Sequence, residues 1–215
     1  MKYKLIMIII LFSSMLFVGF IDNSFPLVQK TIYLDAGHGG VDKGASYDGI
    51  DESTTNLSIV YKLKKLLEKN GAIVYLTRSG DYDLSLPNTS YRKRSDLKER
   101  SILINNSNAD MYISIHLNAY TDFSWNGAQV FYDDINENNK YCAEVIQNSL
   151  KKSLGTTREA KLLKEQYMNS RIKLPGILIE AGFLSNSSER QKLKDSIYQD
   201  KIVNSIVNGI INFYN

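Results

Sequence analysis

Short apolar runs alternate with helical segments along this chain, and this alternation restricts the folds that it can adopt. The runs are apolar throughout and do not alternate with polar residues, which is typical of strands buried on both faces of a parallel sheet. Strands separated by helices predict an α/β fold, a mostly parallel twisted sheet with helices on both faces. The predicted strands are residues 31–34, 72–76, 111–115, 129–132 and 176–179.

Apolar residues at helical spacing lie between these runs, for example Leu57, Val60, Leu63 and Leu67. This spacing predicts helices over residues 53–70, 95–106, 136–154 and 196–213. Residues 79–94 are polar and predict a long loop, and residues 161–171 show no clear period.

The N-terminus has the layout of an export signal, because Lys2 and Lys4 precede an apolar run over residues 5–21. A run of this length is also at the short end of what spans a bilayer, about 17–25 residues. We expect residues 1–21 to be a signal peptide or a membrane anchor, residues 22–30 a linker, and residues 31–215 one folded domain. The domain is then exported, to the outer face of the membrane or the cell wall.

The chain has two histidines, and each follows a predicted strand: His38 after residues 31–34 and His116 after residues 111–115. Ligands of open α/β sheets bind beyond the carboxyl ends of the strands. Neutral imidazole is a common zinc ligand. We therefore predict that both histidines lie just past strand ends and bind one shared metal ion.

A third ligand must come from an acid, because Cys142 is the single cysteine and a thiolate-based site is excluded. Asp35, Asp42, Asp51 and Glu52 are the nearby acids. We favour Glu52, because it begins a predicted helix and a short loop can return it to the strand ends. A favourable contact with the helix dipole explains a glutamate at this place equally well.

Glu180 follows the buried run 176–179. A carboxylate at the end of a buried strand is costly unless it has a partner or a task. Beside a metal-activated water it is a candidate acid/base, and a structural salt bridge is the alternative. The net charge of +3 is small and the basic residues form no block, so we expect no nucleic-acid partner.

Four segments carry a resemblance to a known family: residues 35–45 (DAGHGGVDKGA), Glu52 with Asn56, residues 114–118 (SIHLN) and residues 180–186 (EAGFLSN). They are similar to the signatures of the bacterial zinc-dependent N-acetylmuramoyl-L-alanine amidases, and the resemblance covers nearly all of the expected domain. Family positions that we interpret as mainly structural are Leu76, Thr77, Arg78, Leu97, Arg100 and Asn105.

The resemblance implies that His38, Glu52 and His116 bind one catalytic Zn²⁺ and that Glu180 is the catalytic acid/base. It implies hydrolysis of the amide bond between N-acetylmuramic acid and the L-alanine of the peptidoglycan stem peptide. The domain of residues 31–215 is then a single amidase catalytic domain.

Asn118 and Arg171 are candidate substrate-binding residues by the same resemblance, although the register around Arg171 differs from the family pattern. The short layout is similar to family members that act in sporulation, which implies a role in spore-cortex maturation for germination, through muramic-δ-lactam formation. Because a single domain has little surface for holding a polymer, we expect an activating or localising protein partner, or attachment to the membrane through the N-terminal segment.

Three other functions are compatible with parts of this pattern. A general cell-wall autolysin uses the same chemistry on another wall. A zinc peptidase of the stem peptide uses the same ligands but leaves alanine on the sugar. An inert wall-binding domain is disfavoured, because such a protein is expected to have lost a ligand or Glu180.

Overall fold

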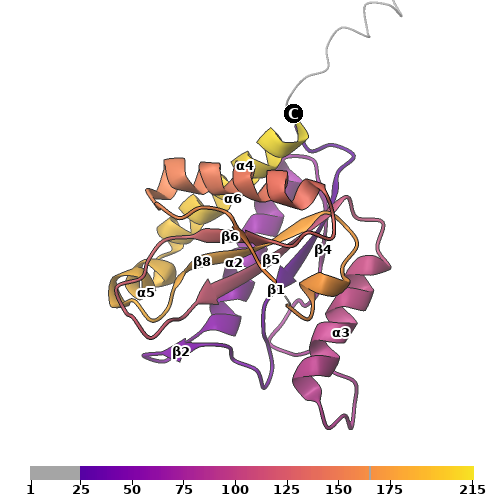
Figure 1. Cartoon of the computed structure of the whole chain (residues 1–215), viewed down its shortest axis with the longest axis vertical. Coiled ribbons are helices and arrows are strands. Elements are labelled where there is room, and N and C mark those ends of the chain that lie inside the picture. The colour runs from indigo at the N-terminus through magenta and orange to yellow at the C-terminus, as the bar shows by residue number, and fades with distance from the viewer. Residues whose placement is uncertain (1–24, 165) are drawn as a thin grey trace, which may run out of the picture.

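The computed structural model describes residues 25–164 and 166–215 (Figure 1). The predicted signal or anchor at residues 1–21 lies outside the described residues. Among the residues described, no helix is both long and apolar enough to cross a membrane. Part of the predicted linker is attached to the domain, because Leu27 is fully buried and its backbone N–H donates to the carbonyl of Asn70 at 2.9 Å.

The centre of the domain is a six-stranded sheet in the order β4-β1-β5-β8-β6-β7. All neighbouring strands are parallel except β6 and β8, which run antiparallel. The predicted mostly parallel sheet is therefore confirmed. The strands are β1 (Thr31–Ala36), β4 (Ile73–Leu76), β5 (Met111–Asn118), β6 (Gln129–Tyr132), β7 (Lys161–Leu162) and β8 (Gly176–Phe183), with a separate hairpin of β2 (Ser46–Tyr47) and β3 (Ile50–Asp51).

Helices cover both faces of this sheet, as predicted. Helices α2, α4, α5 and α6 pack on one face around the main apolar core, and α3 packs on the other face in a smaller cluster with Tyr33 and Tyr112. Figure 1 shows α3 apart from the layer of α4 and α6. The helices are α2 (Glu52–Lys69), α3 (Arg92–Asn105), α4 (Asn138–Leu154), the 3₁₀ turn η2 (Asn169–Arg171), α5 (Ser187–Lys194) and α6 (Ser196–Tyr214).

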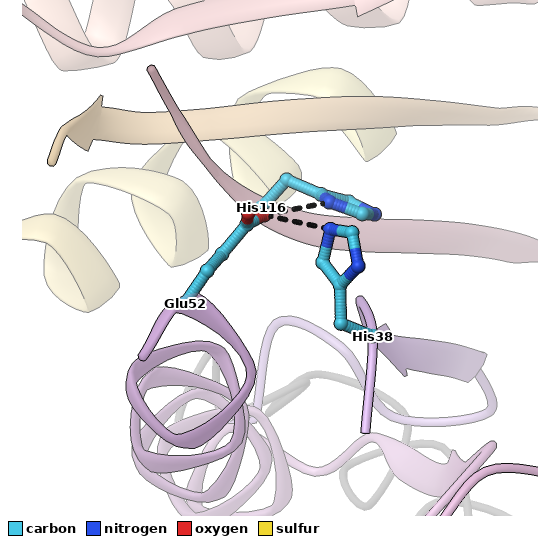
Figure 2. A group of neighbouring side chains, drawn as sticks. All are labelled: His38, Glu52 and His116. Atoms are coloured by element: carbon cyan, nitrogen blue, oxygen red, sulfur yellow. Dashed lines mark hydrogen bonds and ion pairs between the residues drawn. The ribbon is translucent and has the colours of Figure 1, made fainter. Parts of the chain in front are cut away.

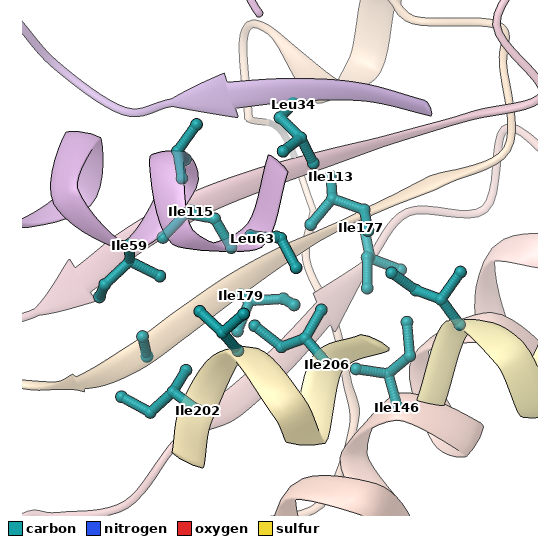
Figure 3. Close-up of a cluster of buried hydrophobic side chains, with 14 of the residues drawn as sticks. Leu34, Ile59, Leu63, Ile113, Ile115, Ile146, Ile177, Ile179, Ile202 and Ile206 are labelled. Carbon is teal, nitrogen blue, oxygen red and sulfur yellow. The ribbon is translucent and has the colours of Figure 1, made fainter. Parts of the chain in front are cut away.

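The central strands are apolar on one face and polar on the other. Alternate residues such as Ile113, Ile115 and Ile179 point into the core beneath α2 and α6, where burial of each large aliphatic side chain stabilises the fold by about 1.5–3 kcal/mol (Figure 3). The residues between them, such as Ser114 and His116, belong to the face beneath α3. The sheet thus separates an apolar core from a face that carries polar groups.

Two strands are longer than predicted. β5 continues to Asn118 and β8 to Phe183, so His116 and Glu180 lie within strands. The prediction that these two residues lie just past strand ends was wrong. The strands continue because Leu117 and Ala181 still point into the core while the polar side chains occupy the other face.

Two helices also differ from expectation. α3 begins at Arg92, inside the segment 79–94 that was predicted to be a loop. α5 was not predicted, and it begins where the Asn186 side chain accepts a hydrogen bond from the backbone N–H of Glu189. In the segment without clear period, the described residues 161–164 and 166–171 include β7 and η2.

Candidate metal centre

Three predicted ligands converge at one point although they come from three elements (Figure 2). His38 follows β1, Glu52 opens α2, and His116 lies in β5. Oε1 of Glu52 is 3.1 Å from Nε2 of His38 and 3.0 Å from Nδ1 of His116. Adjacent ligand atoms around a tetrahedral zinc with bonds of about 2.1 Å lie about 3.4 Å apart, so this spacing fits a metal centre.

Glycines make room for the ligands. A Cβ atom on Gly37 would lie 2.2 Å from Cε1 of His116, so a larger residue there displaces the imidazole. Gly44 has φ of +67°, and a Cβ atom there would lie 2.5 Å from Oε2 of Glu52. These positions explain why the loop that carries His38 is rich in glycine.

Two buried arginines hold the same loop in place. Nε of Arg78 donates to the carbonyl of Ala36 at 2.8 Å, and Nη2 of Arg100 donates to the carbonyl of His38 at 2.6 Å. Arg100 also forms a buried ion pair with Asp35 at 2.7 Å. These contacts support the structural role that was predicted for both arginines, since they fix the backbone around His38.

Backbone donors orient the Glu52 carboxylate. The N–H of Ala45 donates to Oε2 at 2.9 Å and the N–H of Leu117 donates to Oε1 at 3.1 Å. Burial raises the pKa of Glu52, but the hydrogen bonds to His116 and His38 outweigh it and hold the pKa below its usual range. The side chain is therefore an anion at neutral pH, as a metal ligand must be.

Asp42, one of the acids considered from the sequence, contacts His38 from the other side. Its Oδ2 is 3.0 Å from Nδ1 of His38, while Nε2 of that imidazole points to Glu52. Burial raises the pKa of Asp42, but the hydrogen bonds to His38 and the N–H of Gly44 lower it overall. A carboxylate on the second nitrogen of a ligating histidine fixes its tautomer and orientation. Asp42 thus orients a candidate ligand.

Glu180 lies beside the candidate ligands. It is paired with His116 across β5 and β8 and lines the same cavity. Its Oε2 is buried and has no hydrogen-bond partner in the described part of the chain. Burial raises the pKa of Glu180 to about 7. A carboxyl group with this pKa accepts and releases protons near neutral pH, as a general acid/base does.

The cavity has a volume of about 520 Å³ and contains the other predicted residue Asn118 in its lining. Residues 166–169 also line it, from the segment that leads into η2 and from its first residue. Arg171 lies outside this lining: it packs on the ring of Tyr167 at 3.7 Å and donates to the Tyr167 carbonyl at 2.8 Å, beside a neighbouring pocket. The role of Arg171 in substrate binding therefore stays a prediction.

The arrangement has the chemistry of a catalytic zinc site. Two imidazoles and one carboxylate form a three-ligand set, which leaves a fourth position for water or substrate. The ligands line an open cavity rather than a closed structural site, and an unpartnered carboxyl group lies in the same cavity. Such a site is suited to metal-assisted hydrolysis.

Comparison with known proteins gives one consistent result. The family profile described as N-acetylmuramoyl-L-alanine amidase matches residues 32–212. The germination-specific N-acetylmuramoyl-L-alanine amidase of Bacillus subtilis (strain 168) is 44% identical over 195 residues, which are 89% of this chain and 82% of that protein. The CwlD amidase from Clostridioides difficile, solved in complex with the GerS lipoprotein, has a TM-score of 0.82 and 40% identity, and the match covers 86% of this chain and 98% of that chain. The N-acetylmuramoyl-L-alanine amidase from Clostridium difficile 630 has a TM-score of 0.76 and 32% identity over 86% of this chain and 96% of that chain.

Proposed function

The chain belongs to the N-acetylmuramoyl-L-alanine amidase family and is an amidase of peptidoglycan, and on this premise we propose how and where it acts. It cleaves the amide bond between N-acetylmuramic acid and the L-alanine of the stem peptide, with one Zn²⁺ bound by His38, Glu52 and His116. The convergence of these three side chains beside Glu180 in one cavity carries the proposal.

Zn²⁺ at this site supplies a Lewis acid that polarises the amide carbonyl and lowers the pKa of a water molecule. Glu180 takes the proton from the attacking water and donates it to the leaving amine of L-alanine. Its unpartnered Oε2 and its pKa of about 7 support this role, because the group can hold either protonation state near neutral pH. Asn118 lines the cavity beside these groups and contacts the substrate.

We place the enzyme in the maturation of the spore cortex. The B. subtilis relative is a germination-specific amidase, and the match covers most of both proteins. Removal of stem peptides from muramic acid is the step that precedes formation of muramic-δ-lactam, which germination requires. The catalytic domain therefore acts outside the cytoplasm, in the developing spore.

A second protein or the N-terminal segment brings the enzyme to its substrate. The CwlD amidase from C. difficile was solved with the GerS lipoprotein, which supports a lipoprotein partner for this chain. The apolar run at residues 5–21 provides a membrane attachment or an export signal. Either device would bring the catalytic domain to its substrate.

Mass spectrometry of peptidoglycan tests this proposal. The purified full chain is incubated with spore-cortex or vegetative peptidoglycan, with Zn²⁺ added or chelated, beside Glu180→Ala and the surface control Glu144→Ala. We expect stem peptides with free N-terminal alanine and bare muramic acid, dependent on Zn²⁺ and on Glu180, with cortex as the better substrate.

Two results would overturn parts of the proposal. Alanine retained on the sugar would assign a peptidase. Equal cleavage of both walls would favour a general autolysin over the cortex role.

A further inference from the structure

We infer that Asn169 binds amide groups of the substrate, with Oδ1 accepting from an N–H and Nδ2 donating to the carbonyl of a neighbouring group. The inference rests on the proposed function and adds to it a residue that selects the substrate. Asn169 begins η2 and lies in the segment 161–171, where the sequence showed no clear period.

The side chain of Asn169 is buried without a partner. Only 2% of the residue is exposed, and neither Nδ2 nor Oδ1 has a hydrogen-bond partner in the described part of the chain. Buried polar side-chain atoms in native proteins nearly always have a partner, which is a protein group, an ordered water or a ligand. An amide with both its donor and its acceptor unpaired within the protein therefore indicates a place for an ordered water or a ligand group.

Asn169 lies in the lining of the catalytic cavity. The cavity that contains the three candidate zinc ligands and Glu180 also contains Asn169. Of the described side chains with unpartnered buried polar atoms, only Asn169 and Glu180 line it. The two unpaired groups thus belong to side chains that line the same cavity.

The backbone around Asn169 is fixed. Met168 and Ile172 pack in the apolar cluster beneath α3. Asn105 of α3 donates from Nδ2 to the carbonyl of Arg171 at 2.7 Å and accepts from the N–H of Lys173 at 2.9 Å. The amide is therefore held in place before any substrate arrives, which lowers the entropic cost of binding.

The chemistry of the group defines its ligand. A primary amide offers donor hydrogens on nitrogen and an acceptor oxygen in one plane. A trans secondary amide presents its N–H and its C=O on opposite sides, so Oδ1 and Nδ2 pair with an N–H and a carbonyl of neighbouring substrate groups, whereas a carboxylate only accepts. Besides the scissile bond, a muramoyl peptide carries a secondary amide in two places, in the peptide bond after L-alanine and in the N-acetyl group of the sugar.

Kinetics on three soluble substrates test the inference with the zinc-loaded full chain. The first is N-acetylmuramoyl-L-alanyl-D-isoglutamine. The second is N-acetylmuramoyl-L-alanine methyl ester, which lacks the second peptide N–H. The third is the dipeptide with the N-acetyl group removed. The variant is Asn169→Leu, close in shape to asparagine, and Ser170→Ala on the neighbouring exposed residue is the control.

We expect Asn169→Leu to lower kcat/KM on the first substrate by about ten- to hundredfold, because the binding amide is then unpaired. The loss shrinks to less than threefold on the one truncated substrate that lacks the bound amide. That substrate identifies which amide of the substrate Asn169 binds. The midpoint of thermal unfolding stays equal or rises, since an unpaired buried polar group is replaced by an apolar one. Ser170→Ala behaves as the wild type.

Three outcomes would overturn the inference: a loss below threefold on the first substrate, an equal loss on all three, or a lower unfolding midpoint, which would indicate a structural amide bound to water. Failure of the wild type on every substrate would instead contradict the proposed function. In that case the dissociation constants of the three compounds are measured for Glu180→Gln, with and without Asn169→Leu. A loss of affinity that is smaller for one truncated compound would show which amide Asn169 binds.

Discussion

His116 and Glu180 occupy paired positions on the neighbouring parallel strands β5 and β8. The hydrogen-bonded register of the sheet therefore fixes a candidate metal ligand and the candidate acid/base relative to each other. Loops supply the other side of the site, since His38 follows β1 and is held by Arg100. Strands β5 and β8 thus hold His116 and Glu180, and buried arginines hold the backbone of the loop that carries His38.

Glu180→Gln separates proton transfer from metal binding. The variant keeps the shape of the side chain but cannot take or give a proton, so we expect kcat to fall by about 10²- to 10⁴-fold. Zinc content, measured by mass spectrometry, stays at the wild-type value because Glu180 is not one of the three converging residues. Activity within threefold of the wild type would contradict the assigned role.

We expect metal removal to abolish activity, and one candidate ligand, Glu52, can be tested against a control residue on the same helix. We expect a chelator to stop peptide release and added Zn²⁺ to restore it. Glu52→Gln removes the anionic ligand at the start of α2 and lowers zinc affinity, whereas Glu68→Gln at the exposed end of the same helix does not. Equal zinc affinity of the two variants would exclude Glu52 as a ligand.

Asp42→Asn tests the orientation of His38. Without the carboxylate 3.0 Å from Nδ1, the imidazole loses the partner that fixes its tautomer. We expect zinc affinity to fall by about 10- to 100-fold, measured by competition with a chelating dye. The exposed Asp122→Asn serves as the control. An unchanged affinity would show that the backbone alone orients His38.

Asp35 makes stability depend on acid pH. Burial raises its pKa, but Arg100, Ser114 and Thr77 outweigh it and hold the pKa at about 2. A folded-state pKa below the unfolded value of 3.8 gives stability that is present above about pH 4 and lost as pH falls to about 2. The loss is about 2 kcal/mol.

Urea unfolding between pH 5 and pH 2 measures this loss. Asp35→Asn should be less stable at pH 5 and should lack this part of the pH slope. An identical slope in both proteins would be the contrary result.

Glu180 has the opposite effect in the metal-free protein. Burial raises its pKa from 4.5 to about 7, so the folded state binds a proton that the unfolded state has lost. The contribution of Glu180 to stability is therefore largest below about pH 4.5 and falls as pH rises to about 7, by about 3 kcal/mol. Metal-free Glu180→Gln lacks this fall and should unfold at higher urea concentration than the wild type at pH 8. A wild type that is equally stable or more stable at that pH would contradict the assignment.

The sequence predicted the sheet, its main helices and the residues that converge at the site. It predicted His38, His116 and Glu180 because apolar runs mark strands, and residues that follow such runs meet at one edge of a sheet, whereas Glu52 was favoured among four acids and became a predicted ligand through the family resemblance. It misplaced the ends of β5 and β8 for the same reason. A strand that is apolar on one face and polar on the other, as at His116 and Glu180, stops looking apolar before it ends.

Other parts were missed for different reasons. α5 has a sequence signal, Asn186 followed three residues later by Glu189, which is the spacing of a capping box. Asn169 has none, because its importance depends on burial and on unpaired atoms, which no periodicity encodes. The contact of Asp42 with His38 depends on the left-handed backbone at His38, whose φ is +61°.

The division of the central sheet into an apolar face and a polar face makes the site sensitive to indels as well as to substitutions. Because side chains alternate along a strand, deletion of one residue within β5 before His116 would turn the imidazole into the aliphatic core and Leu117 toward the catalytic cavity. A deletion of two residues would keep every remaining side chain on its own face of the sheet but would shorten the strand. Lineages of this domain are therefore expected to vary in length in their loops, while β5 and β8 keep their residue count.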